Sequence, residues 1–344
     1  MSMTNTNRIF DERLSVAPMM DWTDRHCRYF HRLLAPHAVL YTEMVTIGAL
    51  IHGDRARHLN FNEQESPVIL QLGGSDPHDL AQSAKWAHQW GYQGINLNCG
   101  CPSDRVQKGR FGACLMMEGD LVADCVKSMR EASPLPVTVK CRVGVDDQNE
   151  DETLPLFIEK MADAGCEHII IHARKAWLKG LSPKENREIP PLRYDLAARM
   201  RTVFPAMQIT VNGGIASLTQ VQELLSIHHG VMIGREAYQN PIFLAECEHA
   251  LWGTGLPDEE QIIEAMSAYI EKTCASGEVP PRSITRHMTG LFKSRPGGRV
   301  WRRALSELPD TPERLRQAYD MAFGKNKNED LCEADEACTI KAFA

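Results

Sequence analysis

The 344-residue sequence lacks several features that would each assign it to a particular class of protein. No apolar run approaches the roughly 18 residues that a membrane-spanning helix needs, so we expect no membrane partner. The first residues have no signal-peptide core, and a cytoplasmic protein is therefore expected. Excess positive charge is also absent, because 38 Lys and Arg face 45 Asp and Glu, for a net charge of −7. Taken alone, this acidic balance argues against a nucleic-acid partner.

Cysteine is present, but not in a pattern typical of metal sites or disulfide scaffolds. The 11 cysteines are an odd number, which without a secretion signal indicates reduced thiols. No two of them have Cys-x-x-Cys spacing, and the close pair Cys99 and Cys101 would lie on opposite sides of an extended chain. We therefore expect no metal site, and most of the thiols should be small buried side chains.

Short apolar runs alternate with amphipathic segments along most of the chain. Their nearly continuous hydrophobicity is typical of parallel strands that are buried on both faces. The runs are Leu14–Ala17, Ala38–Thr42, Val68–Leu72, Gly94–Leu97, Pro136–Lys140, His168–His172, Gln208–Val211 and Gly230–Ile233. Helical patterns occur at Asp24–Leu34, Leu80–Trp90, Leu121–Glu131, Thr153–Ala164, Leu192–Val203, Ser217–Ser226 and Pro241–Ala250. Eight strands in this alternation over about 250 residues predict a (β/α)8 TIM barrel.

A doubly wound open sheet is the rival fold. It predicts a Gly-x-Gly-x-x-Gly turn after the first strand, where Ala17-Pro18-Met19-Met20 stands instead. The barrel is predicted to occupy residues 1–253. Residues 254–324 have helical patterns at Glu260–Ala275, Ser283–Phe292, Arg299–Leu308 and Pro312–Met321 and no strand pattern, which predicts a small all-helical domain. The tail, residues 325–344, is acidic, and we expect it to be mobile.

Polar residues and glycines follow the predicted strands, at the ends where barrel enzymes carry their catalytic groups. They include Pro18, Met19, Glu43, Gln71, Asn98, Cys101, Lys140, Arg142, His172, Arg174, Asn212, Gly213, Gly214, Gly234 and Arg235. Glycines after the seventh and eighth strands let backbone N–H groups approach an anion, so Gly213, Gly214 and Gly234 predict a phosphate site with Arg235 as its guanidinium clamp. The alternative is that these glycines only make tight turns.

Lys140 leaves two chemistries open. A lysine in the mouth of a barrel can form a Schiff base, or it can hold charge near an electron-accepting ring. Only the second interpretation also uses Gln71 and Cys101. Cys101 itself can be a nucleophile, a general acid or a turn residue, and the glycine-rich segment 107–113 after it could close over a substrate.

Four strand-end segments are informative when they are considered together: Asn98-x-Gly100-Cys101-Pro102-Ser103, Val137-Thr138-Val139-Lys140-x-Arg142-x-Gly144, Ile171-His172-Ala173-Arg174 and Asn212-Gly213-Gly214. With Ala17-Pro18-Met19 and Gly234-Arg235, they resemble the tRNA-dihydrouridine synthases. The segments 20–30, 40–45 and 181–192 look like the A subfamily, and the resemblance covers roughly residues 10–310.

The resemblance implies FMN in the barrel mouth, NADPH as reductant, and reduction of the C5–C6 double bond of uridine at positions 20 and 20a of the tRNA D-loop. It implies that Cys101 gives a proton to C5, and that Asn98 and Arg142 face the uracil. The cofactor would be bound by Pro18, Met19, Met20, Gln71, Lys140, His172, Asn212, Gly213, Gly214, Gly234 and Arg235. The alternatives are a flavin-dependent reductase of a small pyrimidine or enone without a nucleic-acid substrate, and a Schiff-base lyase that uses Lys140. We further expect a monomer.

Two basic stretches are hidden by the net charge. Residues 279–306 hold seven Lys and Arg and no acid, and residues 172–193 hold six against two Glu. Each stretch contains a pair of cations three residues apart, a spacing that shares one helix face. A charged run is commonly only a solvated face, but the resemblance turns these pairs into expected tRNA contacts. The expected contacts are Lys184, Arg187, Arg299 and Arg302, with Trp177 and Trp301 as stacking surfaces.

Overall fold

The structure is a computed structural model that describes residues 11–324. The predicted acidic tail lies outside the described residues. Contacts divide the described chain into two units. Unit 1 contains residues 11–238 and 243–255, and unit 2 contains residues 239–242 and 256–324.

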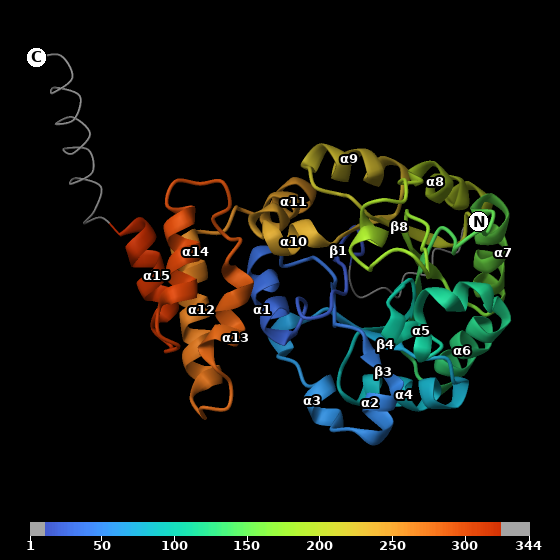
Figure 1. Ribbon diagram of the computed structural model, residues 1–344, viewed down its shortest axis with the longest axis horizontal. Coiled ribbons are helices and arrows are strands. Elements are labelled where there is room, and N and C mark those ends of the chain that lie inside the picture. The colour runs from blue at the N-terminus through green and yellow to red at the C-terminus, as the bar shows by residue number, and fades with distance from the viewer. Residues whose placement is uncertain (1–10, 325–344) are drawn as a thin grey trace, which may run out of the picture. The chain divides into compact units, whose positions relative to one another are not determined.

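Unit 1 is a barrel of parallel strands surrounded by helices (Figure 1). The strands are β1 (Leu14–Val16), β2 (Leu40–Tyr41), β4 (Val68–Gly73), β5 (Gly94–Cys99), β6 (Val137–Arg142), β7 (His168–His172), β8 (Gln208–Asn212) and β9 (Gly230–Ile233). They pair in the order β1-β9-β8-β7-β6-β5-β4-β2. Val39 closes the ring between the first two strands, because its N–H donates to Leu14 O and its carbonyl accepts from Val16 N, both at 2.9 Å. The predicted (β/α)8 barrel is confirmed.

The helices of the barrel begin at recognisable signals. Asp24 caps α1 by accepting the N–H groups of His26 and Cys27, and Asp76 caps α4, which has Pro77 in its first turn. The helices are α1 (Arg25–Leu34), α2 (Ile47–His52), α3 (Arg55–Leu59), α4 (Pro77–Gln89), α5 (Asp104–Lys108), α6 (Gly119–Ala132), α7 (Glu150–Asp163), α8 (Tyr194–Val203), α9 (Leu218–Ile227), α10 (Arg235–Gln239) and α11 (Ile242–Trp252).

The sequence did not predict the short elements of unit 1. Helices α2, α3, α5 and α10 have five or six residues each, too few to show a helical period. A two-residue strand, β3 (Val45–Thr46), pairs with β4 beyond the end of β2. The segment 107–113, expected to be a loop, contains the end of α5 and the start of a 3₁₀ helix at Gly112–Met117.

The strands are buried as their composition predicts. Every residue of β4, β5, β7 and β9 is buried, and the core includes a cluster of Val39, Tyr41, Ile69, Ile170 and Met232. Burial on both faces makes the strands read as continuous apolar runs. It also leaves their carboxyl ends as the positions where polar side chains can gather.

Unit 2 contains helices joined by turns, and no strand is present among its described residues. Its helices are α12 (Glu259–Cys274), α13 (Pro281–Thr285), α14 (Gly298–Glu307) and α15 (Arg314–Phe323). The predicted helix at 283–292 is wrong in extent, because α13 ends at Thr285 and a 3₁₀ turn, Arg286–Met288, follows it. That turn presents Met288 O to the indole N–H of Trp301 at 3.0 Å. Within residues 11–324, no helix has the length and apolar character to cross a bilayer.

Candidate active site

Parallel strands bring the predicted site residues to one end of unit 1. The strand register pairs Asn98 with Lys140, Arg142 with His172, and His172 with Asn212. We call this region the barrel mouth and define it by the strand-end residues Gln71, Asn98, Lys140, Arg142, His172 and Asn212. The barrel therefore gathers residues that lie more than 100 positions apart in the sequence.

A chain of buried carboxamides forms the wall of the mouth across β4, β5 and β6. Gln71 Nε2 donates to Asn96 Oδ1 at 2.7 Å, and Asn96 Nδ2 donates to Thr138 Oγ1 at 2.9 Å. Asn98 Nδ2 donates in turn to Gln71 Oε1 at 2.9 Å. These bonds fix the orientation of each amide, because a flipped amide would place two donors or two acceptors together. Asn96 is an addition to the predicted site.

Cys101 lies in a turn of residues 100–103 between β5 and α5, which we call the cysteine turn. Asn98 Oδ1 accepts the N–H groups of Gly100 and Cys101, both at 3.0 Å. On the other side, Arg142 Nε donates to Gly100 O at 3.0 Å. The Cys101 thiol remains partly exposed, 3.6 Å from Ser103 Oγ, whereas Cys99 is fully buried. The backbone of the turn is thus held from two sides while the thiol stays accessible.

Asn98 and Arg142 were expected to face the uracil, and the structure shows a different use of their polar atoms. Asn98 is 8% exposed and Arg142 is 3% exposed. Arg142 Nη1 donates to Asn186 O at 2.9 Å and to Lys175 O at 3.4 Å. Both side chains therefore position the cysteine turn, and their contact with a uracil stays a prediction.

The mouth carries positive charge, and burial lowers the pKa values of its basic side chains. Lys140 Nζ donates to Asn212 Oδ1 at 3.1 Å, and Asn212 Nδ2 donates to Met232 O at 2.7 Å. Burial, with a smaller contribution from the nearby Arg142, lowers the pKa of Lys140 to about 8. Burial, followed by the charges of Arg142 and Lys140, holds the pKa of His172 well below its ordinary value. The imidazole is therefore neutral at pH 7 beside cations.

Two glycines after β8 are required by the backbone itself. Gly213 and Gly214 have φ angles of 118° and 69°, a region that favours glycine. A Cβ atom on Gly213 would lie 2.7 Å from Cδ2 of His172 and would displace the imidazole. Beside Gly234, the corresponding atom would meet only Ala17 Cβ, at 3.9 Å. The space beside Gly234 suits a ligand, and a phosphate there stays a prediction.

Arg235, the predicted clamp, begins α10 and is paired with an acid. Its Nη1 donates to Glu188 Oε1 at 2.5 Å, and its side chain is 36% exposed. A guanidinium has five N–H donors, so this pair leaves several of them for an anion.

The segment after β1 is closed on itself. Thr23 Oγ1 accepts the N–H of Met19 at 2.9 Å and donates to Met19 O at 3.2 Å. Pro18 and Met19 are half-buried, whereas Met20 is 55% exposed. Asp21 has a φ of 64° and donates its N–H to Glu43 Oε1. Burial raises the pKa of Glu43. The loop that follows β1 is therefore hydrogen-bonded to a largely buried carboxyl group.

The donors at the mouth fit an electron-accepting ring that carries a phosphate. Lys140 Nζ uses one of its three N–H groups. Arg174 Nε is buried and has no hydrogen-bond partner among the described residues. An ordered anion would satisfy such a group. Arg174 was not among the predicted cofactor residues, although its spacing of two from His172 is a signal that could have included it.

The expected tRNA contacts occupy two exposed surfaces, one in each unit. Lys184 and Arg187 are exposed in the loop between β7 and α8, at the 3₁₀ helix Glu185–Arg187. A 3₁₀ turn has three residues, so a spacing of three favours one shared face for the pair, and their contact with tRNA stays a prediction. Arg299 and Arg302 are exposed on α14.

The prediction of Trp301 as a stacking surface is wrong. Trp301 is fully buried and packs edge-on against Phe292, with ring centroids 5.0 Å apart. It lies on the buried side of α14, with Ala304 and Leu305, because the helix turns it away from the exposed arginines. Trp177 is half-buried in the loop after β7.

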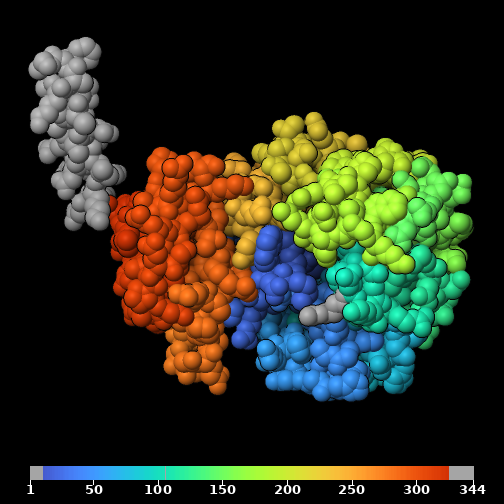
Figure 2. Space-filling model, viewed as in Figure 1, coloured from blue at the N-terminus to red at the C-terminus, as the bar shows by residue number. Residues whose placement is uncertain are grey.

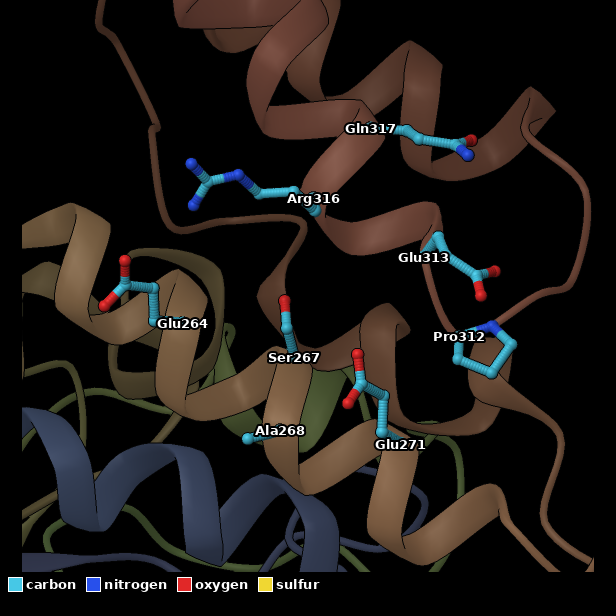
Figure 3. A pocket seen from close by; sticks show the side chains of 8 residues that line it. All are labelled: Glu264, Ser267, Ala268, Glu271, Pro312, Glu313, Arg316 and Gln317. Carbon is cyan, nitrogen blue, oxygen red and sulfur yellow. The ribbon is translucent and has the colours of Figure 1, made fainter.

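Unit 2 also has an acidic hollow on helices α12 and α15 (Figure 3). Its volume is about 400 Å³, and it is lined by Glu264, Ser267, Ala268, Glu271, Pro312, Glu313, Arg316 and Gln317. Arg316 is paired with Glu260 at 2.9 Å and with Asp320 at 3.3 Å. The hollow is thus opposite in charge to the exposed arginines of α14.

Comparison with solved structures supports the architecture. The structure of TcOYE with pHBA has a TM-score of 0.51 at 12% identity and covers 73% of this chain and 92% of that one. The old yellow enzyme homologue from Zymomonas mobilis has a TM-score of 0.50 at 13% identity, covering 73% and 91%. At these identities the likeness shows the fold alone.

Comparison of sequences is far more specific. The model of the dihydrouridine synthase (Dus) family matches residues 15–328. The tRNA-dihydrouridine(20/20a) synthase of Vibrio cholerae is 55% identical over 93% of this chain and 98% of its own length. The protein of the same name from Yersinia pestis is 56% identical over 88% of both chains. The chain therefore belongs to the dihydrouridine synthase family of oxidoreductases.

Proposed function

We propose that this protein reduces uridine at positions 20 and 20a of the tRNA D-loop to 5,6-dihydrouridine, with FMN as bound cofactor and NADPH as reductant. The names of relatives about 55% identical over nearly the whole chain support the substrate. The observation that carries the proposal is the cysteine turn. A partly exposed thiol lies at the end of a barrel strand, in a turn whose backbone is held by Asn98 and Arg142.

FMN fits the donors of the mouth. Lys140, His172, Gln71 and the segment Pro18–Met20 would contact its ring, and Asn212, Gly213, Gly214, Gly234 and Arg235 would hold its phosphate. When bound, FMN takes electrons from NADPH and supplies the hydride that C6 of the uracil accepts. The ammonium group of Lys140 stabilises negative charge on such a ring, and burial strengthens that interaction.

Cys101 completes the reduction as a general acid. Its S–H bond breaks as a C–H bond forms at C5 of the uracil, and the thiolate regains a proton from solvent. The proton must arrive at one carbon, so the direction of the thiol matters. Asn98 and Arg142 set that direction through the backbone of Gly100 and Cys101.

The basic surfaces would bind the phosphates of the tRNA. A uridine inside folded tRNA must be turned out of its stack, which costs a few kcal/mol. Contacts between phosphates and Lys184, Arg187, Arg299 and Arg302 offset that cost and fix the tRNA without reading its sequence. Within residues 11–324, Arg299 and Arg302 form no ion pair, so their charges are available to a polyanion.

A reductase of a small pyrimidine or enone is the alternative within the same chemistry. Such a reductase would use the residues of the mouth, and the arginines of α14 would have no role in its function. A Schiff-base lyase is disfavoured by membership in a family of oxidoreductases, and borohydride trapping of a carbonyl compound on Lys140 would be its signature. We also propose a cytoplasmic monomer without a metal, which sedimentation and metal analysis of the purified protein would test.

The test uses purified protein loaded with FMN, NADPH, and tRNA transcripts that carry no modification, without oxygen. We expect mass spectrometry to find dihydrouridine at positions 20 and 20a, and free uridine to react far more slowly. A protein that cannot be loaded with FMN would contradict the proposal. Equal turnover of free uridine and tRNA would favour the small-molecule alternative.

A further inference from the structure

Two side chains bridge the cysteine turn to the loop between β7 and α8. We call the latter, residues 173–193, the β7–α8 loop. Gln107 Nε2, from α5, donates to Pro102 O and to Leu178 O, both at 2.9 Å. Arg142 donates to Gly100 O and, through Nη1, to Asn186 O. Figure 2 shows the two segments, teal and yellow-green, next to each other on one face of unit 1.

The β7–α8 loop is closed around a buried amide, which ties distant parts of its backbone together. Asn186 is fully buried, and its Nδ2 donates to Trp177 O at 2.8 Å and to Leu181 O at 3.1 Å. Its Oδ1 accepts the N–H of Trp177 at 2.7 Å. A force on the outer residues of such a loop is passed to the points where the loop is attached. Leu178 and Asn186 are two of those points.

Lys184 and Arg187 lie on the outside of this loop. Phosphates that bind them would fix the loop in place, and the carbonyls of Leu178 and Asn186 would then hold Gln107 and Arg142. Both of these side chains end on carbonyls that flank Cys101, namely those of Pro102 and Gly100. The position of the thiol is therefore linked to the position of the expected tRNA contacts.

We infer that Gln107 is a positioning residue that couples the β7–α8 loop to the Cys101 thiol. This inference rests on the proposed function, because it takes the loop as a tRNA contact and Cys101 as the proton donor. Gln107 acts through the backbone of the cysteine turn. It differs from Arg142 in one useful way: it is neutral, so its replacement leaves the charges of the mouth unchanged.

The coupling affects only one half of the reaction. Reduction of the flavin by NADPH needs no proton from Cys101, whereas reduction of uridine does. A looser cysteine turn should therefore slow uridine reduction at saturating tRNA, while flavin reduction and tRNA affinity stay the same. Misplacement of a reacting group by about 1 Å can cost a factor on the order of 100, and a partial loosening should cost less.

Two variants and a matched control test the inference with the FMN-loaded protein. Gln107→Met keeps the length of the side chain and removes both donors, and Gln107→Leu removes them with a shorter, equally neutral side chain. Gln93→Met is the control, since Gln93 also bridges two backbone groups, Val68 N and Gly91 O, at the opposite end of the barrel. Each variant is assayed for kcat and KM with tRNA, the rate of flavin reduction by NADPH, and the solvent isotope effect on uridine reduction.

Both Gln107 variants should lower kcat about tenfold and raise the solvent isotope effect, with KM for tRNA and flavin reduction within twofold of the wild type. Gln93→Met should change none of them. The inference is overturned if kcat stays within twofold, if KM and flavin reduction change equally with kcat, or if both Gln107 variants only lose thermal stability. A wild-type protein that makes no dihydrouridine would instead contradict the proposed function, so the two failures are distinguishable.

Discussion

The cations of the barrel mouth and those of helix α14 use the same chemical groups in opposite surroundings. Lys140 and Arg142 are held by protein oxygens, and burial lowers the pKa of Lys140 to about 8 and that of Arg142 to about 10. Arg299 and Arg302 stand in solvent. A buried charge acts on one neighbouring group with little screening, whereas exposed charges attract a whole polyanion and weaken with salt. We therefore propose that the mouth carries the chemistry and that α14 binds the nucleic acid.

Unit 2 contains a second contrast of the same kind. The hollow between α12 and α15 is lined by Glu264, Glu271 and Glu313, while α14 has three arginines, Arg299, Arg302 and Arg303, on its exposed side. A nucleic acid should approach the α14 side and avoid the hollow. The net charge of −7 is an average that conceals both surfaces.

The largest effect is expected from Cys101→Ser. A hydroxyl is a much weaker acid than a thiol, so formation of dihydrouridine should fall by about 100-fold or more. FMN binding and its reduction by NADPH should not change. Cys114→Ser is the control, because Cys114 is also partly exposed and lies near the cysteine turn, but its thiol donates a hydrogen bond to Phe111 O. Product yield from both variants, measured by mass spectrometry, checks the prediction.

Reversal of the α14 charges should produce the next largest effect. Arg299→Glu combined with Arg302→Glu should weaken tRNA binding at least tenfold and reduce the slope of log affinity against log salt by about 2. NADPH oxidation by oxygen should continue at the wild-type rate. Arg316→Glu, a charge reversal at a half-buried arginine of the acidic hollow in the same unit, is the control and should leave tRNA affinity unaltered. Equal losses from both proteins would remove the distinction between the two surfaces.

A pH titration separates the mouth from α14. The ammonium group of Lys140 loses its proton as pH rises through about 8, so affinity of the flavin-free protein for FMN should fall severalfold between pH 7 and 9. The binding of tRNA does not depend on Lys140, so tRNA affinity should stay nearly constant over this range. Fluorescence quenching of FMN measures the affinity for FMN, and filter binding measures the affinity for tRNA. Lys140→Arg should abolish the inflection near pH 8, and its persistence would assign it to another group.

The smallest effect concerns stability and a histidine outside both regions. His228 precedes β9 at the end of the barrel opposite the mouth, and neither ring nitrogen has a partner among the described residues. Burial lowers its pKa to about 4. In the unfolded chain His228 binds a proton near pH 6.5, whereas in the folded chain it does so only near pH 4. The stability that this difference provides is fully present above pH 6.5. As pH falls from 6.5 toward 4, the free energy of unfolding decreases by at most about 1.4 kcal/mol per pH unit. His228→Leu should flatten the fall of Tm in this range relative to the wild type, as measured by calorimetry.

The barrel could be predicted from the sequence because its signals are local. Buried parallel strands read as apolar runs, and the residue that ends each run is the one that reaches the mouth. The partners of those residues could not be predicted in this way. Arg142 bonds to Asn186, 44 positions later, and Gln107 bonds to Leu178, 71 positions later. Nothing near Arg142 in the sequence shows that its guanidinium holds two loops.

The errors at Trp301 and at the helix 283–292 have a related cause. A tryptophan among arginines suggests a surface for bases, but a helix separates neighbours in sequence onto opposite sides. Trp301 takes the buried side and completes the core around Phe292. In place of the rest of the helix predicted over 283–292, a 3₁₀ turn follows α13 and brings the Met288 carbonyl to that indole. Tertiary packing decided both outcomes.

The role of Cys101 as proton donor is tested most directly by a single turnover without oxygen. The NADPH-reduced wild-type protein and its Cys101→Ser variant are mixed with unmodified tRNA, and both flavin oxidation and dihydrouridine are followed in time. We predict that the wild type forms dihydrouridine at positions 20 and 20a as its flavin is oxidised, while the flavin of the variant stays reduced and at most about one hundredth of the product forms. Equal product from both proteins would contradict the role of Cys101. No product from either would contradict the proposed function itself.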